Sequence, residues 1–280
     1  MKRKWLPLLL AAVLCLTACG AQTPPDSDAP AQGDSFTEVG LLTHELYGVT
    51  VTNIDPDGLL GYTVKLRLEN RSAQDCVFSL DGLALDGLQV TAFLRVTVPA
   101  GQTALEEVCV IEDVVALGVG APTDLAFALR VSDASGALLV PQTVVHCYPR
   151  GAAQAVRFVR EGLATDTVVV DTGDLTLIVT DYYYNRVTGY TAEIYLVNKT
   201  AVDIAVGISD STVNGHAIDP YYAATVMAGT SFFDRIAWNA ADMDAAGITT
   251  VTELVFTLSV NEFCGTMQYL EQTVTLLPAD

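Results

Sequence analysis

Apolar and polar residues alternate one by one along most of the chain from Phe36 onward. The period is clearest in segments 47–52 (YGVTVT) and 61–70 (GYTVKLRLEN), where every second residue is apolar. Successive side chains of a β-strand point to opposite faces, so this period predicts strands with one buried face. Turn sequences such as 55–58 (DPDG) and 86–87 (DG) separate the apolar runs. We therefore expect an all-β chain built from antiparallel β-sandwiches.

One stretch of this pattern occurs twice. A shift of 128 positions places segment 61–101 on segment 189–229, with 12 identities over 41 positions and no gap. Later segments still align with shifts of one or two further residues, which we expect to fall in loops. The chain is therefore predicted to be an internal duplication. Residues held in both copies are interpreted as requirements of the fold, so a ligand site is expected where the copies differ.

The repeat and its flanking sequences divide the chain. We expect a leader at 1–18, a flexible tether at 19–35, a first β-sandwich at 36–148, a linker at 149–163 and a second β-sandwich at 164–280. Both sandwiches are expected to be immunoglobulin-like. The segment 239–247 (NAADMDAAG) predicts the one short helix, with Asn239 as its N-cap.

The first 35 residues indicate export and anchoring. A basic segment (KRK, 2–4) precedes an apolar run at 6–16, which is too short to span a bilayer. The sequence LTACG around Cys19 resembles a lipobox, in which the cysteine receives lipid and becomes the new N-terminus. An ordinary secretory leader is the alternative. Segment 21–35 (AQTPPDSDAPAQGDS) lacks an apolar pattern and would reach at most roughly 50 Å when extended.

Acidic residues dominate the charge balance, 33 against 14 basic residues, for a net charge of −19. Removal of the leader takes away Lys2, Arg3 and Lys4, which leaves 33 acids against 11 bases and a net charge of −22. Such a body repels polyphosphates, so nucleic acid is excluded as a partner. Anionic lipid is disfavoured for the same reason, and the expected membrane partner is reached through the lipid on Cys19.

Three short motifs recur in both copies: Leu-x-Asn-Lys/Arg-Ser/Thr at 68–72 and 196–200, Val/Leu-Asn/Asp-Gly at 85–87 and 213–215, and Ala-Gly at 100–101 and 228–229. Tandem domains with these motifs resemble a group of surface lipoproteins from clostridia and related bacteria. The resemblance covers most of the mature chain. It implies immunoglobulin-like sandwiches with no assigned activity. An Asn after a strand can bond its own backbone, and a Gly supplies positive φ, so we interpret the motifs as folding motifs.

The copies differ most in their aromatic residues. Tyr182, Tyr183 and Tyr184 stand where the first copy has 54–56 (IDP). Tyr221 and Tyr222 replace Phe93 and Leu94 in the same way. Exposed tyrosines offer apolar area and a hydroxyl, which suits sugar rings or a protein partner. The alternative is that they fill the end of a sandwich or the joint between the domains.

We expect no metal or cofactor. Segment 55–58 (DPDG) is like the start of a calcium loop, but the required Glu eleven residues after Asp55 is Leu66. The acid pairs in 171–174 and 242–244 are equally typical of tight turns.

The four cysteines of the mature body leave two alternatives open. Cys109 could bridge to Cys76 or Cys147 outside the membrane, or the thiols could be free and buried. The second copy has Ile204 and Ala237 at the positions of Cys76 and Cys109, so the sandwich does not require a bridge. The fourth cysteine is Cys264.

No catalytic motif appears, and the three histidines, His44, His146 and His216, lie far apart in the sequence. The linker holds Arg150, Arg157 and Arg160, which we expect to pair with acidic domain surfaces, or less favourably to form an anion site.

These observations favour a non-enzymatic adhesion or ligand-binding module on the extracytoplasmic side of a bacterial cell membrane, with an unknown protein or glycan partner. The alternatives are a structural spacer or assembly subunit of the envelope, and more weakly an accessory subunit or hydrolase with a site assembled by folding.

Overall fold

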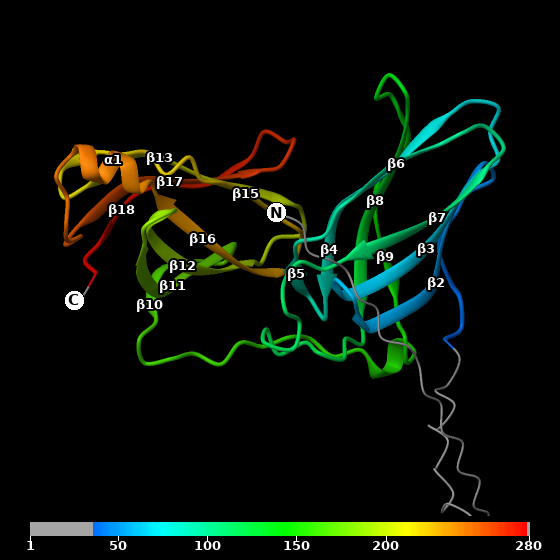
Figure 1. The fold of residues 1–280 in the computed structure, drawn as a ribbon, viewed down its shortest axis with the longest axis horizontal. Coiled ribbons are helices and arrows are strands. Elements are labelled where there is room, and N and C mark those ends of the chain that lie inside the picture. Colours follow the sequence, from blue (N-terminus) through cyan, green and yellow to red (C-terminus); the bar gives the residue numbers. More distant parts are fainter. Residues whose placement is uncertain (1–35, 279–280) are drawn as a thin grey trace, which may run out of the picture. The chain divides into compact units, whose positions relative to one another are not determined.

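The computed structural model describes residues 36–278, which are almost entirely β-strands (Figure 1). The all-β prediction is confirmed. The described part of the chain, from Phe36 onward, forms one compact unit. The expected leader, Cys19 and the tether lie outside the described residues. None of the helices in the described part has the length and apolar character needed to cross a bilayer.

The first sandwich is built from two antiparallel sheets. One sheet has the order β1-β2-β3-β7, with β1 (Val39–Thr43), β2 (Tyr47–Gly58), β3 (Gly61–Asn70) and β7 (Thr103–Cys109). In the other, the strands run β5-β4-β8-β9 and β6 also pairs with β4. Its strands are β4 (Cys76–Leu85), β5 (Leu88–Val90), β6 (Leu94–Val98), β8 (Leu125–Asp133) and β9 (Leu138–Cys147).

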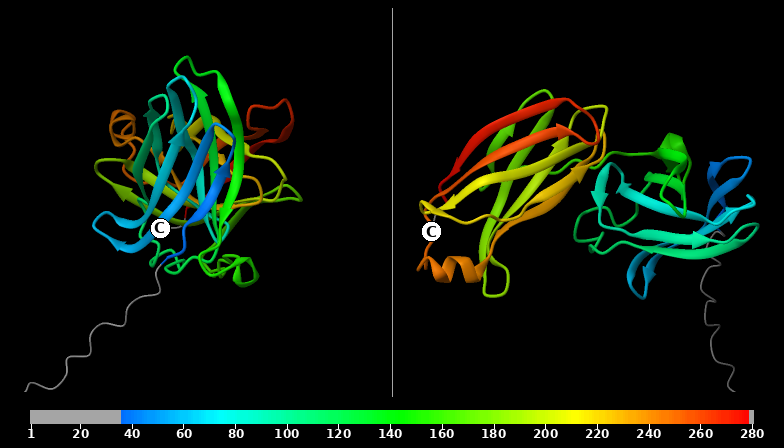
Figure 2. Two further views of the ribbon diagram at one scale, coloured as in Figure 1. Left: turned by 90° about the vertical axis from the view of Figure 1, so that its right-hand side faces the viewer. Right: turned by 90° about the horizontal axis from the view of Figure 1, so that it is seen from above.

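The second sandwich repeats these pairings strand for strand. β10 (Thr167–Asp171), β11 (Leu175–Asn185), β12 (Gly189–Asn198) and β16 (Ser231–Trp238) make one layer. The other layer contains β13 (Ile204–Val213), β14 (His216–Ala217), β15 (Ala223–Val226), β17 (Leu254–Glu262) and β18 (Gln268–Leu276). Figure 2 shows both layers. The immunoglobulin-like classification and the common origin of the halves stay predictions.

Irregularities of pairing also recur at matching places. The register between β2 and β3 shifts after Val51, and that between β11 and β12 shifts after Val179, which lies 128 positions later. A bulge adds one residue to one strand and re-aims the side chains that follow. The bulge after Val179 therefore decides which faces the tyrosines of β11 occupy.

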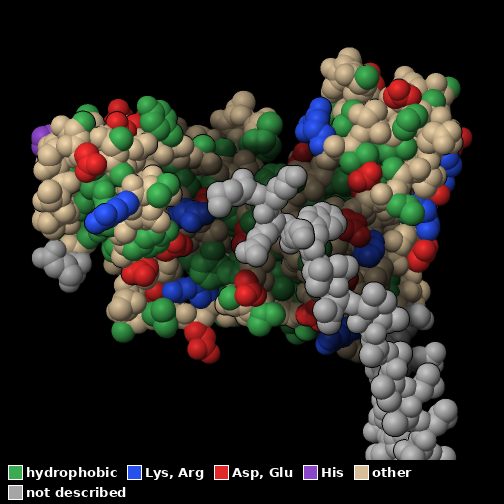
Figure 3. Space-filling model, viewed as in Figure 1, with side chains coloured by type: hydrophobic (Ala, Val, Ile, Leu, Met, Phe, Trp, Pro, Cys, Tyr) green, Lys and Arg blue, Asp and Glu red, His purple; other side chains and the backbone are tan. Residues whose placement is uncertain are grey.

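Each sandwich has its own apolar core. Alternation along β3 buries Val64, Leu66 and Leu68 completely, as the period-two pattern predicts. In the second core, the Trp238 and Phe256 ring centroids lie 6.3 Å apart. Full burial of a Leu or Phe side chain stabilises the fold by about 1.5–3 kcal/mol. Positively and negatively charged side chains lie on the surface (Figure 3).

A buried asparagine closes the same corner in both sandwiches. The Asn198 amide nitrogen donates to the carbonyl oxygens of Val202, Val226 and Met227 at 2.8–3.1 Å. Its Oδ1 accepts from the backbone N–H and the hydroxyl of Thr200. Asn70 makes the equivalent bonds in the first sandwich, to Gln74, Val98, Pro99 and Ser72. The repeated Asn-x-Ser/Thr motif is thus a folding motif.

The Asp/Asn-Gly pairs are tight turns that also hold a distant loop. Asp86 and Gly87 have φ of 51° and 82°, the left-handed region that a two-residue hairpin turn needs. Asp86 Oδ1 accepts from Thr123 N, Thr123 Oγ1 and Asp124 N at 2.7–2.9 Å. Asn214 does the same for Thr252 and Glu253.

The short helix is also confirmed. Helix α1 (Ala240–Ala245) begins after Asn239, whose side chain accepts from Ala241 N at 2.8 Å. A 3₁₀ turn at Ala152–Gln154 lies in the linker.

Replacement of Asn198 by Ala should lower the free energy of unfolding by about 3 kcal/mol, because several buried backbone groups lose their partner. Urea denaturation measures this. Asn261→Ala, at an exposed position of β17, is the control and should change stability by about 0.5 kcal/mol or less. An equal loss of unfolding free energy in Asn198→Ala and Asn261→Ala would contradict the stabilising role of the buried asparagine.

Candidate functional site

The two sandwiches share one continuous sheet. Strand β16 pairs in parallel with β5, Ser231 opposite Leu88 and Phe232 opposite Gln89. Ser231 N donates to Gly87 O at 2.9 Å. The sheet order therefore runs β10-β11-β12-β16-β5-β4-β8-β9, through both halves of the body.

Side chains reinforce this junction. The Gln89 amide donates to Thr225 O at 2.9 Å and accepts from Met227 N at 2.8 Å. Met227 packs with Ala84, Ala126 and Ala128 in a small buried cluster. The small alanine side chains make room for the methionine between the two sandwiches.

Aromatic residues of the second sandwich also contact the first core. Tyr195 is 8% exposed and belongs to the core cluster of the first sandwich. Its ring lies 4.8 Å from that of Phe233, which in turn meets the edge of Phe158 from the linker at 6.2 Å. The aromatics that fill the joint are therefore on β12 and β16, outside the predicted tyrosine set.

The linker is bonded to both halves. Phe158 N donates to Asp86 O at 2.7 Å, and Arg157 donates to Gly229 O. Arg160 forms two hydrogen bonds of 2.7 Å with Asp166 and lies over the Tyr195 ring at 5.5 Å. The expected pairing with a domain acid is present for Arg160.

Arg157 binds a backbone carbonyl instead, and Arg150 is exposed.

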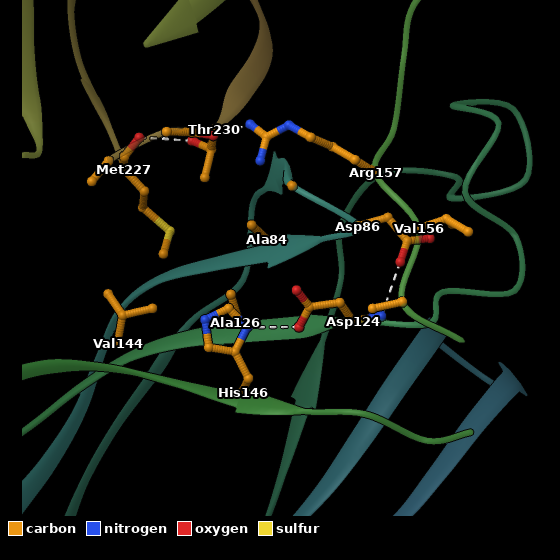
Figure 4. A pocket seen from close by; sticks show the side chains of 14 residues that line it. Ala84, Asp86, Asp124, Ala126, Val144, His146, Val156, Arg157, Met227 and Thr230 are labelled. Atoms are coloured by element: carbon orange, nitrogen blue, oxygen red, sulfur yellow. Dashed lines mark hydrogen bonds and ion pairs between the residues drawn. The ribbon is translucent and has the colours of Figure 1, made fainter. Parts of the chain in front are cut away.

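A cavity of about 290 Å³ opens beside the junction (Figure 4). Its lining is apolar on one side and polar on the other, and consists of Ala84, Asp86, Gly87, Asp124, Ala126, Val144, His146, Ala155, Val156, Arg157, Met227, Ala228, Gly229 and Thr230. Both sandwiches and the linker contribute to it. We refer to it as the junction cavity.

A histidine–aspartate pair forms its polar side. His146 Nδ1 lies 2.7 Å from Asp124 Oδ1, and the imidazole stacks on Tyr148 at 5.5 Å with an interplanar angle of 7°. Asp124 is placed by its own N–H, which donates to Asp86 Oδ1. When Nδ1 carries the proton toward Asp124, Nε2 of the neutral ring is left to accept a hydrogen bond.

Sequence reasoning missed this site. His146 looks isolated in the sequence because its partner Asp124 lies 22 residues earlier, directly before the neighbouring strand β8. A partial signal was present. By strand pairing, the second-copy counterparts of Asp124 and His146 are Glu253 and Thr275. Both sandwiches have an acid at the first position, so a search for differences would select His146 alone and not its pairing with Asp124.

The tyrosines of β11 divide between two faces. Tyr182 stacks on Tyr190 at 6.0 Å and packs against the second core. Tyr183, the next residue, hydrogen-bonds to Arg235, which raises the pKa of that guanidinium. Tyr184 is 50% exposed. The bulge after Val179 sets this division.

The other two predicted tyrosines lie before β15. The Tyr222 hydroxyl donates to Asp234 Oδ2 at 2.9 Å. Burial, followed by the charge of Asp234, raises the Tyr222 pKa, and burial also raises that of Asp234. Tyr221 is 86% exposed, and its counterpart Phe93 is also exposed, at 73%. The five tyrosines thus have different neighbours, and ligand binding by them stays a prediction.

The body cysteines are free thiols, so the unbridged alternative holds. Burial raises the pKa of Cys76 and of Cys147 to about 11. Cys109 accepts from the Thr63 hydroxyl at 3.6 Å, and Cys264 is exposed. Across residues 36–278, no group of three or more His, Cys, Asp or Glu side chains is arranged to hold a metal ion.

No family model matches the chain, and no curated protein does. Among solved structures, the chain is similar to red sea bream transglutaminase, with 12% identity over 77% of this chain and 28% of that one and a TM-score of 0.22. It is also similar to a protein of unknown function from Porphyromonas gingivalis W83, with 17% identity over 71% and 83% of the two chains and a TM-score of 0.19. The chain thus spans less than a third of the transglutaminase, and these likenesses carry no functional argument.

The pair of Arg160 and Asp166 predicts a pH dependence. Hydrogen bonds from Arg160, then from Leu163 N, lower the Asp166 pKa to about 2, against about 3.9 in an unfolded chain. Stability from this group is therefore present above about pH 4 and is lost as the pH falls toward 2.

Asp166→Asn should destabilise the protein at pH 7 and have a much smaller effect at pH 2, as measured by urea unfolding at both pH values. Asp57→Asn, in the exposed β2–β3 hairpin, should have little effect at either. A loss for Asp166→Asn that is the same at both pH values would refute the assignment.

Proposed function

We propose that the protein is a lipid-anchored extracytoplasmic binding module whose small-molecule ligand occupies the junction cavity. The observation that carries the proposal is the cavity itself, which joins a polar pair, His146 and Asp124, to an apolar wall that includes Met227. Ligand sites combine apolar walls with a few placed polar groups, and about 300 Å³ suffices for a small ligand.

The chemistry of the lining defines the ligand class. His146 Nε2 accepts from a hydroxyl or amine, while Val144 and the accessible parts of Ala126 and Met227 contact an apolar portion. Asp124 keeps the imidazole in one orientation, so the acceptor is already in place before the ligand arrives. A sugar, an amino sugar or an amino acid has this combination of groups.

The location rests on the sequence. The basic segment, the short apolar run and the lipobox-like residues around Cys19 support lipid attachment outside the cytoplasm. The acidic body then makes contact through its ligand and not through anionic headgroups.

A structural spacer of the envelope is the second candidate. The continuous sheet through β16 and β5 favours it, because hydrogen-bonded strands resist bending at the joint. In that case the cavity binds nothing.

The weaker hydrolase alternative needs a nucleophile beside His146. The described lining holds no serine or cysteine, and its Thr230 hydroxyl donates to Met227 O at 2.9 Å.

Saturation-transfer NMR on the body (36–280) with neutral monosaccharides, amino sugars and free amino acids tests the proposal. We expect at least one compound to receive saturation, and His146→Ala to remove the signal by loss of the acceptor. Tyr183→Ala, on β11 and absent from the cavity lining, should leave it intact. Loss of the signal in Tyr183→Ala alone would favour the tyrosine hypothesis, and no signal with any compound would favour the spacer.

A further inference from the structure

Three loops of the first sandwich meet at one end of its strands. The β2–β3 turn spans 58–61, and Tyr62, which follows the turn, accepts from Val110 N at 2.9 Å. Val110 also forms a β-bridge with Ala92. The turn, the segment after β5 and the segment after β7 are therefore held side by side by backbone contacts.

Large apolar side chains at this end are exposed. Leu59 is 100% exposed, Leu60 and Phe93 are each 73% exposed, and Ile111 is 67% exposed. Single exposed apolar residues are ordinary on protein surfaces. Several on loops that touch one another form a patch, and such patches mark interaction sites.

The same loops carry only negative charge. Segments 54–60, 91–93 and 111–113 contain four acids, Asp55, Asp57, Glu112 and Asp113, and no Lys or Arg. Glu112 is fixed in place, since both its carboxylate oxygens accept from Thr91 N at 2.9–3.0 Å. We call the four exposed apolar residues and these acids the apolar–acidic end.

The equivalent turn of the second sandwich has a different character. Residues 186–188 (RVT) place one exposed apolar residue, Val187 at 87%, next to Arg186. Tyr183 and Asn185 stand where the first sandwich has Asp55 and Asp57, and Arg186 stands where it has Gly58. The combination of a leucine pair with acids is thus specific to the first sandwich and is not required by the fold.

We infer that the apolar–acidic end is a docking surface for a protein partner that presents apolar side chains bordered by Lys or Arg. Charge complementarity selects this occupant. Four carboxylates attract a basic rim and steer its approach, whereas they repel anionic lipid headgroups. The leucine pair then supplies the apolar centre that carries most of the binding energy in such contacts. The inference does not depend on the ligand of the junction cavity.

Fluorescence anisotropy with a labelled amphipathic helix of Leu and Lys as the probe tests this surface on the body (36–280) at physiological salt. Leu59→Ser/Leu60→Ser should weaken binding at least tenfold. Asp55→Asn/Asp57→Asn should weaken it about threefold through lost attraction. Val187→Ser, the matched change in the second sandwich, should leave affinity within about twofold. Leu59 and Leu60 are exposed in a turn, so the melting temperature should not change.

Equal affinity of the leucine variant and the native body would overturn the proposal, because attraction of the basic helix to an acidic body would then explain all binding. An unchanged affinity of the Asp55→Asn/Asp57→Asn variant would refute the claim that the partner presents Lys or Arg to these acids. Flotation of the native body with phosphatidylcholine vesicles, abolished by Leu59→Ser/Leu60→Ser, would show a membrane contact in its place.

Discussion

The parallel pairing of β16 with β5 determines where every other contact of the junction forms. Two residue pairs are in register, and they bring Met227 over the alanines of β4 and β8 and Gln89 against the backbone of β15 and the residue that follows it. The linker then crosses the joint and bonds to Asp86 and Gly229. The junction cavity exists only because these elements meet, so the proposed function depends on a joint that neither sandwich has alone.

The fold was largely predictable from the sequence because its signals are local. A period of two fixes the faces of β3, a left-handed turn needs Asp86-Gly87, and Asn239 caps the helix that follows it. The candidate site was not predictable in the same way. His146 and Asp124 become neighbours through the register of β8 with β9, which no short motif encodes.

One difference between the two sandwiches is explained by the junction. Tyr195 and Phe233 contact the first sandwich, and their counterparts by strand pairing are Arg67 and Leu105. Arg67 pairs with Glu38 on the surface, and Leu105 is 75% exposed. The aromatic pair is thus present where the other sandwich covers it and absent at the equivalent, exposed position.

Calorimetric unfolding of the body (36–280) tests most directly whether the junction makes the two sandwiches one cooperative unit. The native protein should unfold in one transition. Phe233→Ala should divide it into two, because the ring that joins Tyr195 to Phe158 is lost, and the matched Leu105→Ala should leave one transition. Two independent transitions in the native protein, or the same behaviour in both variants, would contradict the account.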